Sequence, residues 1–229
     1  MDYKILYPEA FPIVQLEMQK GETLQAESDA MIAMSPTIDV EGKTSGGFMG
    51  GLMRKVLTGE SFFLQHLTAS RGPGRVLIGH PLPGGIHPME LDGSHGLTVQ
   101  KGGFLAATPG IEIDTKAQNL TKGLFSGEGI FVLNIRGRGT VFVSSYGAIH
   151  PIEVPAGQEV IIDNGHLVAW PETMDYEIEK ASSGGLLSSL KSGEGLVCRF
   201  RGPGTVLIQT RNPEGFTGWI RSMLPGQSG

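Results

Sequence analysis

The sequence has a single cysteine in 229 residues, so it can form no internal disulfide and offers too few thiols for a Cys-rich zinc site. It also lacks any apolar run close to the ~18 residues that a membrane-spanning helix needs. Its start, Met1-Asp2-Tyr3-Lys4, lacks the basic segment and apolar core of a secretory signal peptide. These absences favour a reducing compartment, and we expect a cytoplasmic location.

Basic charge and catalytic motifs are scarce as well. The chain carries 18 Lys and Arg against 23 Asp and Glu, and a formal net charge of −5 is unfavourable for general nucleic-acid binding. It contains no Gly-x-Ser-x-Gly motif of a serine nucleophile, and its Gly-x-Gly sites do not extend to Gly-x-Gly-x-x-Gly. We therefore predict a protein that is not an enzyme and that has no cofactor.

Glycine, in contrast, is abundant, with 35 residues, and it occurs in elements that recur three times. A Gly-x-Gly segment followed by an apolar run returns at intervals of 65 residues, at 72–78, 137–143 and 202–208. The same two elements precede each copy in the same order: first an apolar segment that ends in proline, then a Gly-Glu pair. This order predicts three internal repeats at about 14–79, 87–144 and 150–209, within one compact unit over residues 1–229.

Each predicted repeat has the pattern of β-structure. Short runs of β-branched and aromatic residues, such as 141–143 and 160–162, are bounded by Gly, Pro, Asp and Asn. The Gly-x-Gly segments are predicted to be hairpin turns, as are 101–103 and 163–165, because glycine adopts positive φ without strain. Long helical periodicity is absent. The fold class is therefore predicted to be all-β, with sandwich-like repeats.

Glycine-rich apolar inserts interrupt this β pattern in each repeat, at 46–57, 123–125 and 184–190. In the first insert, apolar residues recur at the spacing of a short helix. Its candidate interaction surface consists of Phe48, Met49, Leu52, Met53, Arg54 and Lys55. One interpretation is that this helix closes an open end of its own sandwich. The other is that it contacts another subunit, a protein partner or a membrane surface.

The threefold Gly-Glu and Gly-x-Gly-x-Val pattern, together with the Gly-Gly-rich insert before Gly59-Glu60-Ser61-Phe62-Phe63, resembles the altered inheritance of mitochondria protein twenty-four family. The resemblance covers about residues 4 to 220. It implies a fold like that of the trp RNA-binding attenuation protein, of double-stranded β-helix type, with three units around a pseudo-threefold axis. It implies no particular activity, although mitochondrial members are associated with inner-membrane organisation. The chain lacks a transit peptide, so we expect a bacterial or archaeal cytosolic member.

Two matching Ile-His-Pro segments are the candidate metal or ligand site. They supply His87 with Glu90, and His150 with Glu153. His and Glu are metal ligands, and pseudo-symmetry would bring the two pairs together. We favour a structural role, in which proline fixes the entry to a strand, because metal sites need three or four converging ligands. The sequence therefore predicts no metal site.

Arginines flank every Gly-x-Gly segment: Arg71, Arg75, Arg136, Arg138, Arg199 and Arg201. Aromatic residues do not alternate with them as stacking platforms for RNA would, so we interpret them as solvated charges on edge strands. The glutamates of the Gly-Glu pairs are interpreted as structural for the same reason. Cys198 takes the place of a leucine in another repeat, and we expect it to be a small buried apolar residue.

These patterns favour a non-enzymatic scaffold or interaction protein that self-associates, with a membrane surface as one partner to consider. The rival hypothesis is a protein that binds a small ligand or a metal through the Ile-His-Pro-x-Glu segments. RNA binding, by analogy of fold alone, is a weaker alternative.

Overall fold

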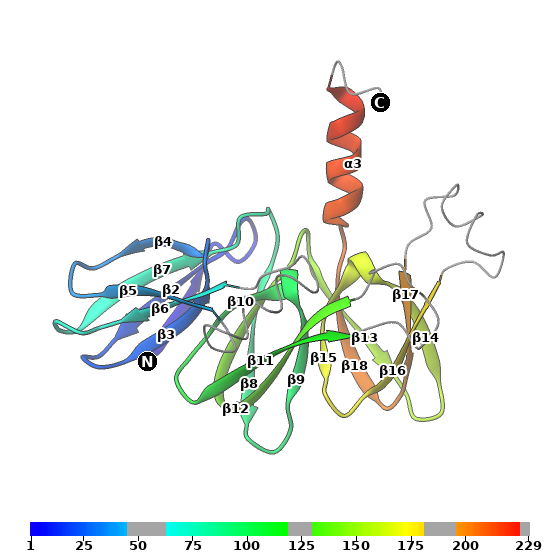
Figure 1. Ribbon diagram of the computed structural model, residues 1–229, viewed down its shortest axis with the longest axis horizontal. Coiled ribbons are helices and arrows are strands. Elements are labelled where there is room, and N and C mark those ends of the chain that lie inside the picture. The colour runs from blue at the N-terminus through cyan, green and yellow to red at the C-terminus, as the bar shows by residue number, and fades with distance from the viewer. Residues whose placement is uncertain (45–62, 119–129, 181–195, 225–229) are drawn as a thin grey trace.

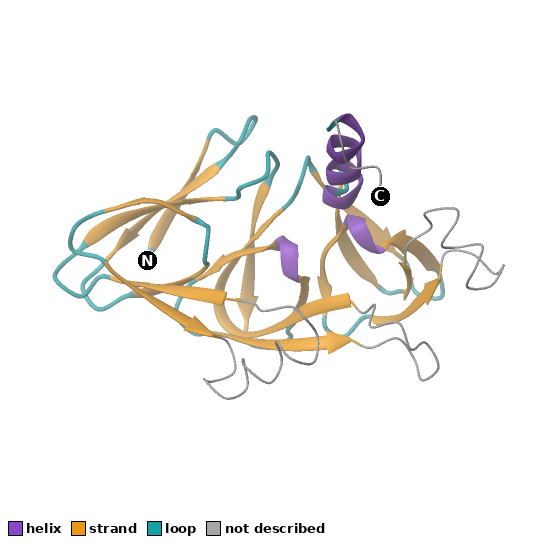
Figure 2. Cartoon of the chain, turned by 45° about the horizontal axis from the view of Figure 1, so that its top comes forward, coloured by secondary structure: helices purple, strands orange, loops and turns teal. Residues whose placement is uncertain are grey.

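The computed structural model describes residues 1–44, 63–118, 130–180 and 196–224. Strands dominate this part of the chain, together with one α-helix and two short 3₁₀ turns (Figures 1 and 2). The predicted all-β class is confirmed. The six candidate residues of the first insert and the glutamates of the three Gly-Glu pairs lie outside the described residues.

The strands fall into three groups along the chain. The first group contains β1 (Asp2–Leu6), β2 (Ile13–Met18), β3 (Thr23–Glu27), β4 (Met31–Met34), β5 (Asp39–Thr44), β6 (Phe63–Thr68) and β7 (Gly74–Gly79). The second contains β8 (Ile86–Asp92), β9 (Leu97–Gln100), η1 (Lys101–Gly103), β10 (Phe104–Ala107), β11 (Ile111–Gln118) and β12 (Ile130–Ser144). The third contains β13 (Ile149–Val154), β14 (Glu159–Asp163), η2 (Asn164–His166), β15 (Leu167–Pro171), β16 (Asp175–Lys180), β17 (Leu196–Arg201) and β18 (Gly204–Gln209), followed by helix α3 (Pro213–Met223).

Strands pair in the same way in each group. The strand after the Gly-x-Gly segment lies between two partners: β7 between β2 and β4, the second half of β12 between β8 and β10, and β18 between β13 and β15. The strand before that segment also has two partners: β6 lies between β3 and β5, the first half of β12 between β9 and β11, and β17 between β14 and β16. All these pairs are antiparallel.

The groups stand side by side in chain order, joined by two further strand pairs (Figure 1). β10 of the second group pairs with β3 of the first, and β15 of the third pairs with β9 of the second. Three clusters of buried apolar side chains fill the interior, around Leu16, Val141 and Phe200. Closing the groups around one axis would pair β4 with β14, and no pairing of these two strands occurs in the described part of the chain. The pseudo-threefold axis is therefore not confirmed.

The prediction of hairpin turns at the Gly-x-Gly segments is wrong. β12 runs without a break through Gly137 and Gly139, and β17 and β18 pair with different strands rather than with each other. The two glycines have φ of 110° and 150°. A Cβ on Gly137 would lie 2.1 Å from the carbonyl oxygen of Gly110. Glycine is needed here because the strand bends from one sheet into the other, not because the chain reverses.

The other two predicted hairpins are also wrong. Residues 101–103 and 164–166 form single 3₁₀ turns, and the strands on either side of each turn do not pair with one another. The side chains of Gln100 and Asp163 accept hydrogen bonds at 2.7 Å from the backbone N–H groups of Gly102 and Gly165. These side-chain caps stabilise a turn that carries the chain between sheets.

Helix α3 was not predicted, although the sequence holds its signals. Asn212 caps the helix: its side-chain oxygen accepts from the N–H groups of Glu214 at 2.9 Å and Gly215 at 3.4 Å. Pro213 occupies the first turn, where its missing N–H costs nothing. With 11 residues, the helix is too short to show the long periodicity that identifies a helix most clearly in a sequence.

Candidate functional site

The predicted His and Glu pairs do not converge on a common point. His87 and Glu90 lie three residues apart on β8, which pairs in regular register with β12. His150 and Glu153 have the same spacing on β13, which pairs regularly with β18. Side chains alternate along a strand, so residues three apart point to opposite faces. Over the described ranges, no three His, Cys, Asp or Glu side chains lie close enough to hold a metal ion.

Glu90 has a structural contact instead. Its two carboxylate oxygens accept from the hydroxyl of Thr140, at 2.9 and 3.1 Å, on the neighbouring strand β12. The carboxylate also lies beside Tyr3. Burial, and secondarily the charge of Glu90, raises the pKa of the Tyr3 hydroxyl. Glu90 therefore joins the first strand of the chain to the second strand group.

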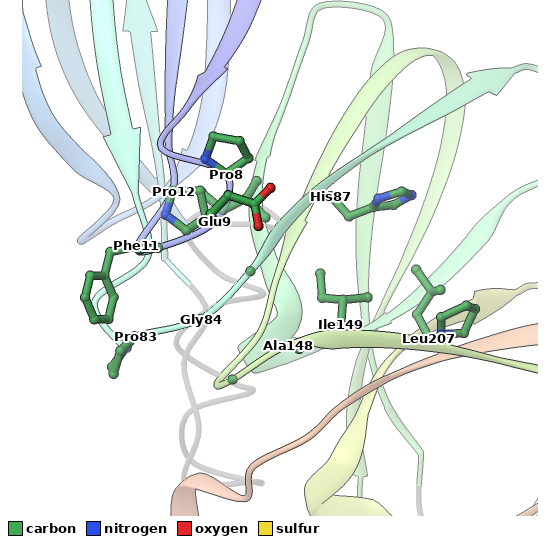
Figure 3. Close-up of a pocket in the computed structure, with 15 residues that line it drawn as sticks. Pro8, Glu9, Phe11, Pro12, Pro83, Gly84, His87, Ala148, Ile149 and Leu207 are labelled. Atoms are coloured by element: carbon green, nitrogen blue, oxygen red, sulfur yellow. The ribbon is translucent and has the colours of Figure 1, made fainter.

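His87 lines a pocket of about 750 Å³ where the first group meets the next two. The β1–β2 turn, residues 8–12, forms one wall, and the segments around Gly84 and Ala148 form the other (Figure 3). Most of the lining is proline, glycine and aliphatic side chains, and Glu9 and His87 are its titratable groups. Such a pocket suits a small, mainly apolar molecule with one polar group.

The β1–β2 turn beside this pocket has an unusual backbone. Tyr7 and Phe11 have φ of 55° and 56°, a left-handed conformation that residues other than glycine seldom adopt. The Ala10 N–H donates to the Tyr7 carbonyl at 3.0 Å and closes the turn. Both aromatic side chains remain exposed. The turn therefore presents two large aromatic rings to solvent, of which Phe11 also lines the pocket.

Five of the six flanking arginines are paired with carboxylates of neighbouring segments. Arg71 contacts Asp39, Arg75 contacts Glu17 at 2.6 Å, and Arg136 contacts Glu172. Arg199 binds Glu179 at 2.7 Å and Glu159 at 3.2 Å, and Arg201 binds Glu159 at 2.9 Å and both Asp175 and Glu177 at 3.0 Å. The hydrogen bonds from Arg201 and Arg199 lower the pKa of Glu159. These pairings make the arginines a poor phosphate-binding surface.

Cys198 lies fully buried on β17, as the sequence predicts. Burial raises the pKa of its thiol to about 12, so at neutral pH it is protonated and unreactive. Strand pairing agrees with the leucine alignment: Cys198 lies opposite Ile162 as Leu133 lies opposite Val99. In the first group the residue in this place is Gln65, opposite Ala26.

The apolar surface that sequence reasoning missed is α3. Its large apolar residues recur along one side and are all exposed: Phe216, Trp219, Ile220, Met223 and, at its C-cap, Leu224. No residue of the helix is buried, and α3 projects away from the strands (Figures 1 and 2). The Phe216 ring packs against Tyr146, with centroids 5.5 Å apart, which anchors the first turn. No helix of the described chain has the length and apolarity to cross a membrane.

Three comparisons with known proteins agree. The family model described as mitochondrial biogenesis AIM24 matches residues 3–211. An uncharacterised protein of Streptococcus pyogenes serotype M6 is 32% identical over 225 residues, which are 95% of this chain and 89% of that protein. A crystal structure of a Streptococcus pyogenes protein, 30% identical, superposes with a TM-score of 0.82 and covers 97% of this chain and 99% of its own. The resemblance noted from the sequence is thus confirmed: the chain belongs to the AIM24 family.

Proposed function

We propose that this protein is a non-enzymatic scaffold that contacts a membrane surface through α3. One observation carries the proposal: α3 exposes four large apolar side chains on one side, its C-cap Leu224 exposes a fifth, and no residue of the helix is buried. A short helix that packs against nothing is only marginally stable in water, and it gains stability when its apolar face is covered. In the sequence, a membrane contact was one alternative for the first insert, beside closure of its own sandwich or contact with a protein; we assign the membrane contact to this helix.

The composition of α3 favours a lipid interface over a protein groove. Its apolar positions follow the spacing of one helix face, and they include Phe216 and Trp219, aromatic residues that suit the boundary between headgroups and acyl chains. The remaining positions are small or uncharged apart from Glu214 and Arg221. The chain itself is acidic. We therefore expect binding through apolar insertion, without a requirement for anionic lipids.

Vesicle flotation tests this proposal. The full chain is mixed with small phosphatidylcholine vesicles, and in a second arm with vesicles that also contain phosphatidylglycerol. We expect the wild-type protein to float in the first arm, with no gain in the second. Trp219→Ser combined with Ile220→Ser should abolish flotation while the melting temperature stays unchanged, because neither residue is buried.

The matched control is Val40→Ser, which removes an exposed apolar side chain from β5 instead. This variant should float like the wild type. Failure of the wild type to bind either vesicle overturns the proposal. So does undiminished flotation of the α3 variant. If α3 binds a protein but does not bind vesicles, the helix is assigned to a protein partner instead.

We also infer that the three strand groups are copies of one unit of the kind found in the trp RNA-binding attenuation protein. The support is the recurrence of the same antiparallel pairings around each Gly-x-Gly segment. The boundaries of the units and the axis that relates them stay predictions. Circular dichroism of the isolated segment 81–211 tests this inference, because an array of autonomous units should keep its β spectrum when one unit is removed.

A small-ligand protein is the second candidate, favoured by the pocket at His87. The filling variant Ile149→Trp tests it. We expect a thermal-shift screen of short-chain apolar acids and amines to raise the melting temperature of the wild type and not of this variant. A screen in which no compound separates the two proteins would remove this candidate.

A further inference from the structure

Two strand pairs inside the chain show how one group joins the next. β10 pairs with β3 through Ala106 opposite Ala26, and β15 pairs with β9 through Ala169 opposite Val99. In both cases a strand with a proline at or just after its end, Pro109 or Pro171, reaches back to the preceding group. The junction therefore has one geometry, used twice.

β4 occupies the place of β10 and β15 in its own group. Ala33 lies opposite Leu77 on β7, as Ala106 lies opposite Phe142 and Ala169 opposite Leu207. In all three strands the register shifts at the residue immediately before the alanine. This shared irregularity fixes the correspondence residue by residue.

The three corresponding strands differ in exposure. β10 is buried throughout and β15 is buried up to its final proline, whereas three of the four residues of β4 are exposed. At the register shift, Leu105 of β10 is 1% exposed and Val168 of β15 is 0% exposed, whereas Ile32 of β4 is 55% exposed. β4 reads Met-Ile-Ala-Met and carries none of the charges or prolines that protect an edge strand from pairing. Its sequence suits a buried junction, and the described residues of its own chain supply no second strand to form one.

Among the described residues, the opposite half of that junction is an unpaired edge at the other end of the molecule (Figure 1). β14 corresponds to β9. Ile162 lies opposite Cys198 as Val99 lies opposite Leu133, and both Cys198 and Leu133 lie four residues before the first glycine of their Gly-x-Gly segment. β9 is flanked on both sides, by β12 and β15, whereas β14 is the last strand of its sheet. Ile161 on β14 is 52% exposed.

We propose that β4 of one copy pairs antiparallel with β14 of a second copy, which continues the row of groups from chain to chain. The two internal junctions set the register: Ala33 lies opposite Ile162, and Met34 lies opposite Ile161. Because the two halves of the interface are different strands, the contact is head-to-tail. Until the row of chains closes, an unpaired β4 edge remains at one end of the row and an unpaired β14 edge at the other. A row that closes on itself is a ring, in which both edges are paired, and we expect a ring here.

Site-specific cross-linking tests the register and the polarity together. Met34→Cys and Ile161→Cys are made in separate chains. Neither protein alone can form the head-to-tail disulfide, whereas an oxidised mixture should give a covalent dimer that contains one chain of each. Cys198 does not interfere, since it is fully buried. A matched mixture of Val40→Cys with Ile161→Cys should give no such dimer.

Light scattering measures the assembly itself. We expect the wild type to have a mass several times that of one chain, and Ile32→Lys with Met34→Lys, or Ile161→Lys alone, to reduce it to one chain without a change in β content. A wild type that stays monomeric at every concentration overturns the proposal. So do lysine variants that keep the wild-type mass, and so does cross-linking of Met34→Cys with itself, which would indicate a symmetric contact. The vesicle experiment on α3 is independent of all these outcomes.

Discussion

β4 and β15 have the same pairing pattern in two different settings. Both follow a turn, both shift register before an alanine, and both pair with the strand after a Gly-x-Gly segment. Yet β15 is inside the protein, where Trp170 is 1% exposed, and β4 is on its surface. The difference lies in the next strand: β15 has β9 beside it, and β4 has no second partner strand in the described chain.

This comparison teaches that burial at a sheet edge is set by the neighbour rather than by the strand. Met-Ile-Ala-Met is no less apolar than Leu-Val-Ala-Trp, so composition does not separate the two. An exposed apolar edge is an aggregation hazard unless something specific covers it. The open ends of the row are therefore the part of the molecule where specificity of contact matters most.

Removal of the buried Trp170 side chain should have the largest effect on the free energy of unfolding. Trp170 packs edge-on against Tyr176 and Phe200, with ring centroids 5.1 and 5.3 Å away. We expect Trp170→Ala to lower the free energy of unfolding by about 3–5 kcal/mol, through lost burial and a cavity. Met34→Ala, at the corresponding place in β4, should lower it by less than about 1 kcal/mol in samples dilute enough to be monomeric.

Urea unfolding followed by fluorescence and circular dichroism gives both values. Equal losses in the two variants under monomeric conditions would mean that β4 is already covered within one chain. The comparison between the two strands would then fail.

Self-association should produce the next largest effect. If a second copy covers β4, the native state is stabilised by mass action, by about 2.7 kcal/mol when the free protein is at 100 times its dissociation constant. We expect the melting temperature of the wild type to rise with protein concentration. Ile161→Lys should melt at the same temperature at all concentrations, since a lysine on β14 leaves the facing edge unpaired.

Calorimetry over a hundredfold range of concentration measures this dependence. Val40→Lys, on a different edge strand, is the control and should keep the wild-type behaviour. A melting temperature that is independent of concentration in the wild type would contradict the expectation.

The smallest effect should come from the ion pairs that flank β14. Arg201 and Arg199 lower the pKa of Glu159 below its ordinary value of 4.5. The contribution of this carboxylate is therefore present above the unfolded-state pKa and is lost as the pH falls through the folded-state pKa. Glu159→Gln should melt slightly below the wild type at pH 7, and the difference should shrink as the pH falls.

The effect is small because these charges are exposed to solvent. Melting temperatures of both proteins from pH 7 to pH 3 measure it, with Glu153→Gln on β13 as the matched exposed control. A difference that grows as the pH falls would contradict the assignment.

Sequence patterns located several strands correctly, and the error at the Gly-x-Gly segments has one cause. The runs at 141–143 and 160–162 lie in β12 and β14, and the proline-bearing segments lie in β4, β10 and β15. Glycine at 137 and 139 was also recognised as a special backbone site. Its role was mistaken, because a strand that bends into another sheet and a chain that reverses both need the same freedom of φ.

The candidate site was less accessible to sequence reasoning. His87 was singled out and does line the pocket, but its wall at residues 8–12 comes from a turn with no recognisable motif. The Asn-Pro start of α3 and its apolar spacing were readable and were passed over, since the helix is short. The open edges of β4 and β14 left no trace in the sequence at all.

The sequence by itself determined the local alternation of strands and bends and the apolar character of β4, β10 and β15, because these depend on neighbouring residues along the chain. Only the tertiary structure decided that two of these strands are buried and the third is exposed. Burial is a property of what lies beside a strand, and the partner of β10 or β15 is some 80 or 70 residues away in sequence. The partner that β4 lacks is, by our inference, on another chain.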